Sequence, residues 1–286
     1  MSEETTAGAA TAAEGGRELT VGIAVLAGVV AVTSLLTGAL MAGGALFGEI
    51  TGPFAAPGPV GQGVVGAAML GTAPGLLLVG RARTWEEVRT LVLPLGVVLV
   101  GLFTVGLTNA GSLQAAQGGP LFLALFSLGW LPVLGVLALG AVVCIGRQYA
   151  RRAVPLRRRA PLPGWSKPFL AVLGSSWLGI GAGLLVLPGF WSDFVPWRVG
   201  RADAQALGVW ALAMGVGVLG ALVDDDLGRG RPALVALPGV AVAVGVVLAA
   251  NASDVDWASG PGCSLVTLIG GLLVAGVAGC RMAPRE

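Results

Sequence analysis

The 286-residue chain contains no histidine, and this absence excludes several functions. Histidine-ligated haem, zinc or copper, Ser-His-Asp hydrolysis and histidine proton relays all need that side chain. The three cysteines, Cys144, Cys263 and Cys280, are too few and too scattered for a disulfide framework or a metal cluster. We therefore expect neither a cofactor nor a bound metal.

Charged residues are also scarce. They make up only 11% of the chain, whereas hydrophobic residues make up 55% and the mean hydropathy is +0.87. A soluble domain carries about 25% charged residues, so this chain cannot cover itself with a hydrated surface. The net charge of +2 gives no indication of a nucleic-acid partner. Apolar segments that cross a bilayer explain this composition.

Long apolar tracts are what the sequence does contain. Each has the roughly 20 residues that a helix needs to cross the hydrocarbon core. Backbone polar groups must pair internally in lipid, and no tract alternates as the strands of a barrel do. The sequence therefore predicts an all-α integral membrane protein with eight transmembrane helices. The predicted spans are 21–46, 61–80, 90–108, 121–146, 169–189, 205–223, 232–250 and 263–280.

Positive charge is divided unevenly between the two sets of loops. Of the 17 lysines and arginines, fifteen lie on the side of both termini and only Arg198 and Arg201 lie opposite. The positive-inside rule then predicts a plasma (inner) membrane protein with both termini in the cytoplasm. We expect residues 1–19 to form a disordered cytoplasmic tail. We expect the basic linker 147–167 to lie against anionic headgroups, with docking of a partner as the alternative.

The sequence predicts an internal repeat at an offset that stays near 142 to 143 residues, with slips to 141 and 144. Aromatic, acidic, proline, glycine and asparagine positions recur in register, which predicts two four-helix halves, 20–146 and 168–286. Each half has an even number of spans, so the halves should be parallel repeats about an axis along the membrane normal. The pairs include Phe47/Phe190, Glu49/Asp193, Pro53/Pro196, Phe54/Trp197, Gln62/Gln205, Gly66/Gly208, Leu70/Leu212, Gly75/Gly217, Arg89/Arg231, Pro94/Pro238, Asn109/Asn251 and Gly119-Pro120/Gly260-Pro261.

Candidate site residues lie on the outer face. The second outer loop is richer than its twin, since Trp197 and Arg198 replace Phe54 and Ala55. Its tryptophans fit interfacial anchors. We expect Arg198 or Arg201 to contact Asp193 or Asp203, with a lipid phosphate or a partner's carboxylate as the alternative. The candidate outer-face site comprises Glu49, Asn109, Asp193, Trp197, Arg198, Arg201, Asp203 and Asn251. On the inner side, Asp224, Asp225 and Asp226 are predicted to be solvated or helix-capping acids.

The spans contain no charged residue in their cores, which argues against ion-coupled transport, proton pumping and voltage sensing. The leading hypothesis is a non-enzymatic accessory or scaffold component of the cell envelope. The alternative is a transporter or lipid-handling protein for an uncoupled apolar or amphipathic substrate, with a path between the halves. A membrane enzyme comes third, because no nucleophile–base pair is visible. The expected partners are membrane lipids, with another envelope membrane protein as a further candidate.

The segment VPWRVGRADAQALGVWAL, residues 195–212, carries one resemblance. It resembles a Trp-Pro-rich loop followed by Ala-Arg-x-x-Gly-Ala-Trp in uncharacterised multi-pass membrane proteins of high-GC actinobacteria. The match covers this stretch alone, and the Trp-Pro order is reversed here at Pro196-Trp197. It implies a bacterial inner membrane and no particular activity.

Overall fold

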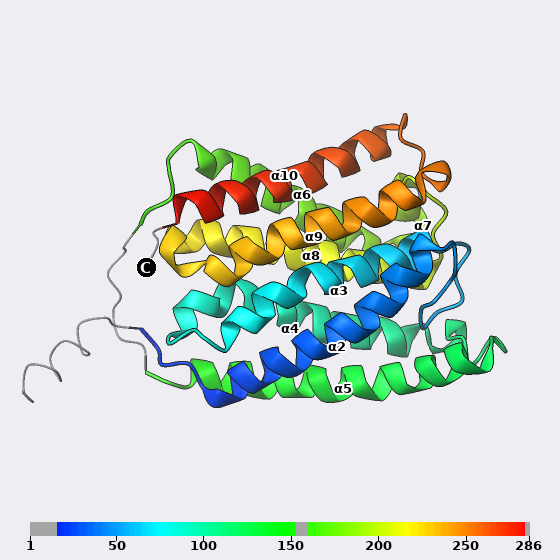
Figure 1. The fold of residues 1–286 in the computed structure, drawn as a ribbon, viewed down its shortest axis with the longest axis horizontal. Coiled ribbons are helices and arrows are strands. Elements are labelled where there is room, and N and C mark those ends of the chain that lie inside the picture. Colours follow the sequence, from blue (N-terminus) through cyan, green and yellow to red (C-terminus); the bar gives the residue numbers. More distant parts are fainter. Residues whose placement is uncertain (1–15, 153–159, 284–286) are drawn as a thin grey trace, which may run out of the picture.

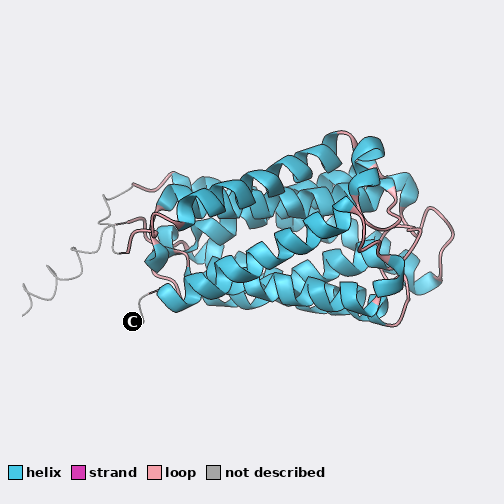
Figure 2. Ribbon diagram, turned by 90° about the horizontal axis from the view of Figure 1, so that it is seen from above, coloured by secondary structure: helices cyan, strands magenta, loops and turns pink. Residues whose placement is uncertain are grey.

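The computed structural model describes residues 16–152 and 160–283. This part of the chain is a bundle of helices with two isolated β-bridges, and its long helices follow the long axis of the molecule (Figures 1 and 2). Eight of the helices are long and apolar enough to cross a membrane, which confirms the predicted number of spans. They are α2 (Val21–Leu46), α3 (Val60–Val79), α4 (Trp85–Thr108), α5 (Leu121–Tyr149), α6 (Ser166–Val186), α8 (Arg201–Asp224), α9 (Arg231–Ala250) and α10 (Gly260–Met282). Short helical turns connect them: η1 (Ala110–Ser112), α7 (Pro188–Trp191), η2 (Ser192–Phe194), η3 (Leu227–Arg229) and η4 (Ala252–Asp254).

The helix ends differ from the predicted spans for local reasons. α4 and α8 begin four or five residues before the apolar tracts, because Glu86, Glu87 and Asp203 occupy their first turns, where acids are favourable. The tract 169–189 is divided, since α6 ends at Val186 and α7 starts at Pro188. Proline disfavours a helical conformation in the residue before it, and the backbone of Leu187 is accordingly not helical.

The bundle has two ends of different character. The start of α2, the turns α3–α4 and α8–α9, and the end of α10 lie at one end, which we call the basic end (Figure 1). The loops α2–α3, α4–α5, α6–α8 and α9–α10 lie at the opposite end, which we call the far end. Both described termini, near Gly16 and Ala283, are therefore at the basic end. The last four residues of the predicted tail, 16–19, are described, and this stretch is held by backbone hydrogen bonds: the Leu19 N–H donates to Arg83 O at 3.0 Å and the Trp85 N–H donates to Arg17 O at 2.8 Å. The remaining tail residues, 1–15, lie outside the described part.

Helix pairing crosses between the two parts of the sequence. α2 packs on α3 and α6 on α8, but α3 also packs on α9, and α8 on α4. α5 covers α4, and α10 covers α9. As a result α3 is the most enclosed of the eight helices, whereas α5, α6 and α10 expose most of their apolar side chains at the periphery. Such a periphery is suited to hydrocarbon rather than water.

Glycines set the closest contacts of the bundle. A Cβ atom on Gly66 of α3 would lie 3.0 Å from Gly38 O of α2, and one on Gly208 of α8 would lie 3.0 Å from Gly181 O of α6. Gly75 behaves in the same way toward the carbonyl of Pro232 in α9, at 2.5 Å. Close backbone approach at small residues is typical of packing between membrane helices, which relies on van der Waals contact.

Candidate functional site

The predicted outer-face residues lie at the far end but do not converge on one site. Three of them join neighbouring helices instead. Asn251 Nδ2 donates to Ala45 O at 3.0 Å, and Asn109 Nδ2 donates to Gln205 Oε1 at 2.8 Å. The buried Asp203 accepts a hydrogen bond from Gln62 Nε2 at 3.3 Å. These contacts tie α2, α3 and α4 to α8 and α9, which is a structural role.

The expected ion pair in the second outer loop does not form among the described residues. Arg198, Arg201, Asp193 and Glu49 are all exposed, and none of them makes a salt bridge to a described residue. Asp203 is unavailable because it points into the bundle toward Gln62, where it is only 3% exposed. The prediction that Arg198 or Arg201 pairs with an acid of its own loop was therefore wrong.

A cavity of about 500 Å³ lies beneath this loop. It is bounded by α6, α8, α9 and α10, with the loop after α7 above it and α3 behind it. We call it the far-end cavity. Its volume is within the range of small-molecule sites, roughly 300–1,000 Å³, and its lining is almost wholly apolar. Among the eight predicted residues only Trp197 lines it.

Four tryptophans gather around the far-end cavity: Trp177 of α6, Trp191 of α7, Trp197 of the following loop and Trp210 of α8. Trp197 and Trp210 are each only 8% exposed. The indole nitrogens of Trp177, Trp197 and Trp210 are buried, and no described residue accepts a hydrogen bond from them. A buried donor without an acceptor costs about 1–3 kcal/mol. The rings thus form an apolar part of the cavity wall, and their indole nitrogens are enclosed within the protein.

The first part of the chain contains a much smaller cavity between α2, α4 and α5. It measures only about 30 Å³ and is lined by Trp130, which is 6% exposed.

The sequence held a signal for these tryptophans that the interfacial reading missed. At the predicted repeat offset of 142 to 143 residues, the four rings pair with smaller residues, namely Ser34, Gly48, Phe54 and Ala68. Rings that are present at only one of two paired positions mark a difference between the predicted halves. Interfacial anchoring alone gives no reason for that difference.

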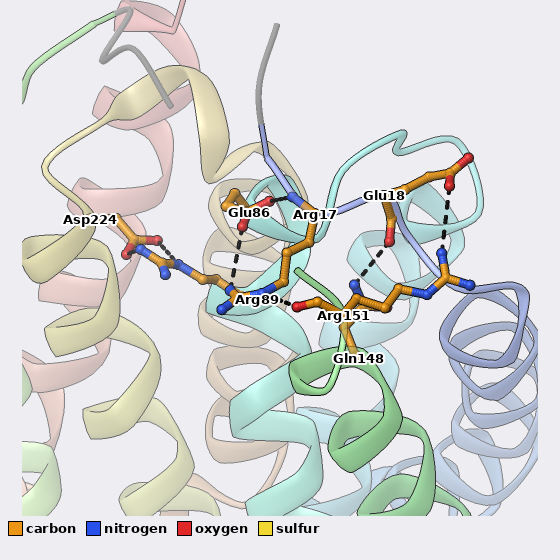
Figure 3. A network of polar contacts seen from close by, with 7 residues as sticks. All are labelled: Arg17, Glu18, Glu86, Arg89, Gln148, Arg151 and Asp224. Atoms are coloured by element: carbon orange, nitrogen blue, oxygen red, sulfur yellow. Dashed lines mark hydrogen bonds and ion pairs between the residues drawn. The ribbon is translucent and has the colours of Figure 1, made fainter. Parts of the chain in front are cut away.

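At the start of α2, a network of polar contacts joins the ends of several helices at the basic end (Figure 3). The Arg17 backbone N–H donates to Glu86 Oε2 at 2.9 Å, and its guanidinium lies 5.4 Å from the Tyr149 ring centre. Gln148 accepts from the Thr20 N–H at 3.0 Å and donates to Glu18 O at 3.0 Å. The segment before α2 is thereby fastened to the start of α4 and the end of α5.

The acidic triplet Asp224 to Asp226, at the end of α8, is not solvated, in contrast to the prediction. Arg89 of α4 makes two hydrogen bonds to Asp224, one of them from Nε at 2.8 Å (Figure 3). Lys167 Nζ lies 2.9 Å from Asp225, and Arg229 Nε lies 3.1 Å from Asp226. The three carboxylates are 6%, 14% and 0% exposed. They are shielded because the chain before α6 folds over them, with the N–H groups of Ala160 and Leu162 donating to Asp226 and Asp225.

Comparisons with protein-family models, with curated proteins and with solved structures found no match for this chain.

Proposed function

We propose that the chain is a multi-pass protein of the bacterial plasma membrane with both termini in the cytoplasm. The eight apolar helices support membrane insertion. The orientation is supported by the excess of lysine and arginine at the basic end, where both described termini lie (Figure 1).

Accessibility of engineered cysteines tests this orientation. In a variant without Cys144, Cys263 and Cys280, single cysteines at Ala116 or Ala258 of the far end should react with an impermeant thiol reagent added to intact cells. Cysteines at Gly80 or Ala150 of the basic end should react only after the membrane is opened. All four positions are exposed, so burial cannot mask the result. Labelling of Gly80 and Ala150 in intact cells would reverse the orientation.

We also propose that residues 20–146 and 168–286 are parallel repeats joined by the basic linker 147–167. Equivalent contacts support this division. Gln114 N–H donates to Pro53 O at 2.9 Å, and Asp256 N–H donates to Pro196 O at 2.7 Å, a pair displaced by 142 and 143 residues. The Gly38–Gly66 and Gly181–Gly208 contacts are related by the same offset. Residues 153–159 of the linker lie outside the described part.

The function that the geometry supports best is retention of a lipid-like molecule by a non-enzymatic component of the cell envelope. The far-end cavity carries this proposal, because four tryptophans converge on it, whereas the cavity between α2, α4 and α5 measures only about 30 Å³. The seam between the halves is packed through Gly75 and Pro232 and through Gly217 and Thr90, which disfavours a transport path along it. We therefore keep the lipid-handling hypothesis but not the path between the two halves that was expected with it.

The size of the cavity favours a lipid chain over a partner's helix. A transmembrane helix 10 Å wide and 30 Å long occupies roughly 2,400 Å³, several times the volume of the far-end cavity. An alkyl or prenyl chain is narrow enough to enter between α6 and α10, which contact each other only sparsely.

Obstruction of the cavity mouth tests this function. Ser264 and Leu268 are one turn apart on α10 and both line the cavity. A Ser264→Trp/Leu268→Trp variant should lose at least about tenfold in co-purified lipid, equivalent to about 1.4 kcal/mol, when measured by native mass spectrometry. Val266→Trp/Leu273→Trp places the same rings on α10 at exposed positions outside the cavity and should retain the lipid. Equal lipid content in both variants would refute the proposal.

A further inference from the structure

A second cavity, of about 360 Å³, lies at the basic end between α6, α8, α9 and α10. We call it the basic-end cavity. Only Met214 of α8 lines both this and the far-end cavity. Between them α6 and α10 touch, since a Cβ atom on Gly271 would lie 2.8 Å from Leu173. The buried side chains Leu173, Val218, Ala241 and Leu272 form a separate small cluster at this level. The two cavities are therefore distinct sites.

The walls of the basic-end cavity are apolar and its mouth is amphipathic. Leu170, Leu237 and Ala278 are among the side chains that line it. At the mouth, Trp165 is 68% exposed and Met282 is 39% exposed. Asp226 also lines the cavity, but its carboxylate faces Arg229 and the Ala160 N–H. The interior is mainly apolar and accepts hydrocarbon; besides Asp226, the hydroxyl side chains of Thr72, Thr90 and Ser166 line the cavity.

Two arginines flank this mouth. Arg231 is the first residue of α9 and follows Gly230, which lines the cavity. Arg281 of α10 is three residues after Ala278 and seven after Val274, so it lies on the same helix face as these two lining residues. Both arginines are exposed, and neither forms a salt bridge within residues 16–152 and 160–283.

The neighbouring cations of the basic end, unlike Arg231 and Arg281, are paired with acids. Arg17, Arg89, Arg151, Lys167 and Arg229 each pair with a carboxylate of the chain. The local acids are thus neutralised by other residues, and the mouth keeps the positive charge of Arg231 and Arg281. An anion at this position meets two guanidinium groups, which suit the geometry of phosphate oxygens.

We propose that the basic-end cavity binds an anionic phospholipid, with an acyl chain inside the cavity and the phosphate group between Arg231 and Arg281. The volume is within the range of small-ligand sites and far below that of a helix. The charge of the mouth selects an anionic headgroup over a zwitterionic one. This inference is independent of the far-end cavity, since a different set of residues carries it.

The test uses the purified full-length chain in nanodiscs that contain either phosphatidylcholine alone or a mixture with phosphatidylglycerol. Lipid that stays bound after transfer to detergent is quantified by native mass spectrometry. The wild-type protein should retain phosphatidylglycerol in preference to phosphatidylcholine. Arg231→Gln/Arg281→Gln should weaken phosphatidylglycerol binding about thirtyfold. Each cation near an anionic headgroup strengthens binding roughly fivefold, and the variant removes two of them.

A matched control removes the same charge from the same end of the bundle. Arg81 and Arg83 are exposed, make no salt bridge to a described residue and line neither cavity, so Arg81→Gln/Arg83→Gln should bind as the wild type does. Ala278→Phe, which fills the cavity and keeps both arginines, should also lose the lipid. Size-exclusion profiles and melting curves establish that each variant is folded. Equal losses in the two arginine pairs, or full binding in Ala278→Phe, would overturn the proposal.

Discussion

Arg89→Ala should lower the free energy of unfolding by about 3 kcal/mol, the loss typical of a buried pair with one partner removed. Arg89 of α4 holds Asp224 of α8 through two hydrogen bonds, and the carboxylate is only 6% exposed. Without the guanidinium, Asp224 stays buried beside no compensating cation. The unfolding midpoint in a denaturing detergent titration, followed by circular dichroism, measures the loss.

Two controls separate this effect from general loss of charge. Arg151 pairs with Glu18 at 3.5 Å, but both side chains are well exposed, at 48% and 86%. Arg151→Ala should therefore cost less than about 1 kcal/mol. The double variant Arg89→Ala/Asp224→Ala should recover most of the loss, because no orphaned carboxylate remains. If the double variant is as unstable as Arg89→Ala, the pair has no special role in stability.

Gly66→Leu should lower the free energy of unfolding by a similar amount, about 3 kcal/mol. This value is at the upper end of the range for overpacked positions. A Cβ atom on Gly66 would lie 2.7 Å from Ala42 N and 3.0 Å from Gly38 O. These are backbone atoms of α2, so the two helices must separate to admit a side chain. The same denaturation assay measures the change.

Gly208→Leu provides the comparison that bears on the proposed repeat. Gly208 meets Gly181 O at 3.0 Å and Leu185 N at 3.1 Å, as Gly66 meets α2. The two substitutions should therefore have equal effects within about 1 kcal/mol. Gly43→Leu is the control in α2, because no atom lies within 4 Å of a Cβ built there. A tolerated leucine at Gly66 would show that the contact is not tight in the membrane.

The fold class followed from the sequence because bilayer thickness imposes a length and a composition on each span. Eight apolar helices were expected and eight are present. Boundaries were less accurate where charged residues continue a helix beyond its apolar tract, as Trp85–Glu87 do at the start of α4. Local composition records the hydrocarbon core, whereas a helix ends where its backbone hydrogen bonds end.

The candidate site was less predictable, because its residues are distant in the sequence. Asp224 appeared solvated, and nothing local to it indicates Arg89, which is 135 positions earlier. Trp197 was predicted to anchor the chain at the membrane interface, and in the structure it lines the far-end cavity. Its place in a cavity depends on how α6, α8, α9 and α10 pack around it. The local sequence around a tryptophan near a membrane boundary is the same whether the ring anchors at the interface or lines a cavity.

The crossed packing of α3 on α9 and of α8 on α4 has a consequence for synthesis in the cell. When α3 leaves the ribosome, the surface that it will bury against α9 does not exist until about 170 more residues are made, roughly 10–35 s at 5–20 residues per second. During that interval the glycine-rich face of α3 is open to lipid or to an insertion factor. Neither half can complete its own interior, so a chain interrupted after α5 leaves a fragment for quality control to remove.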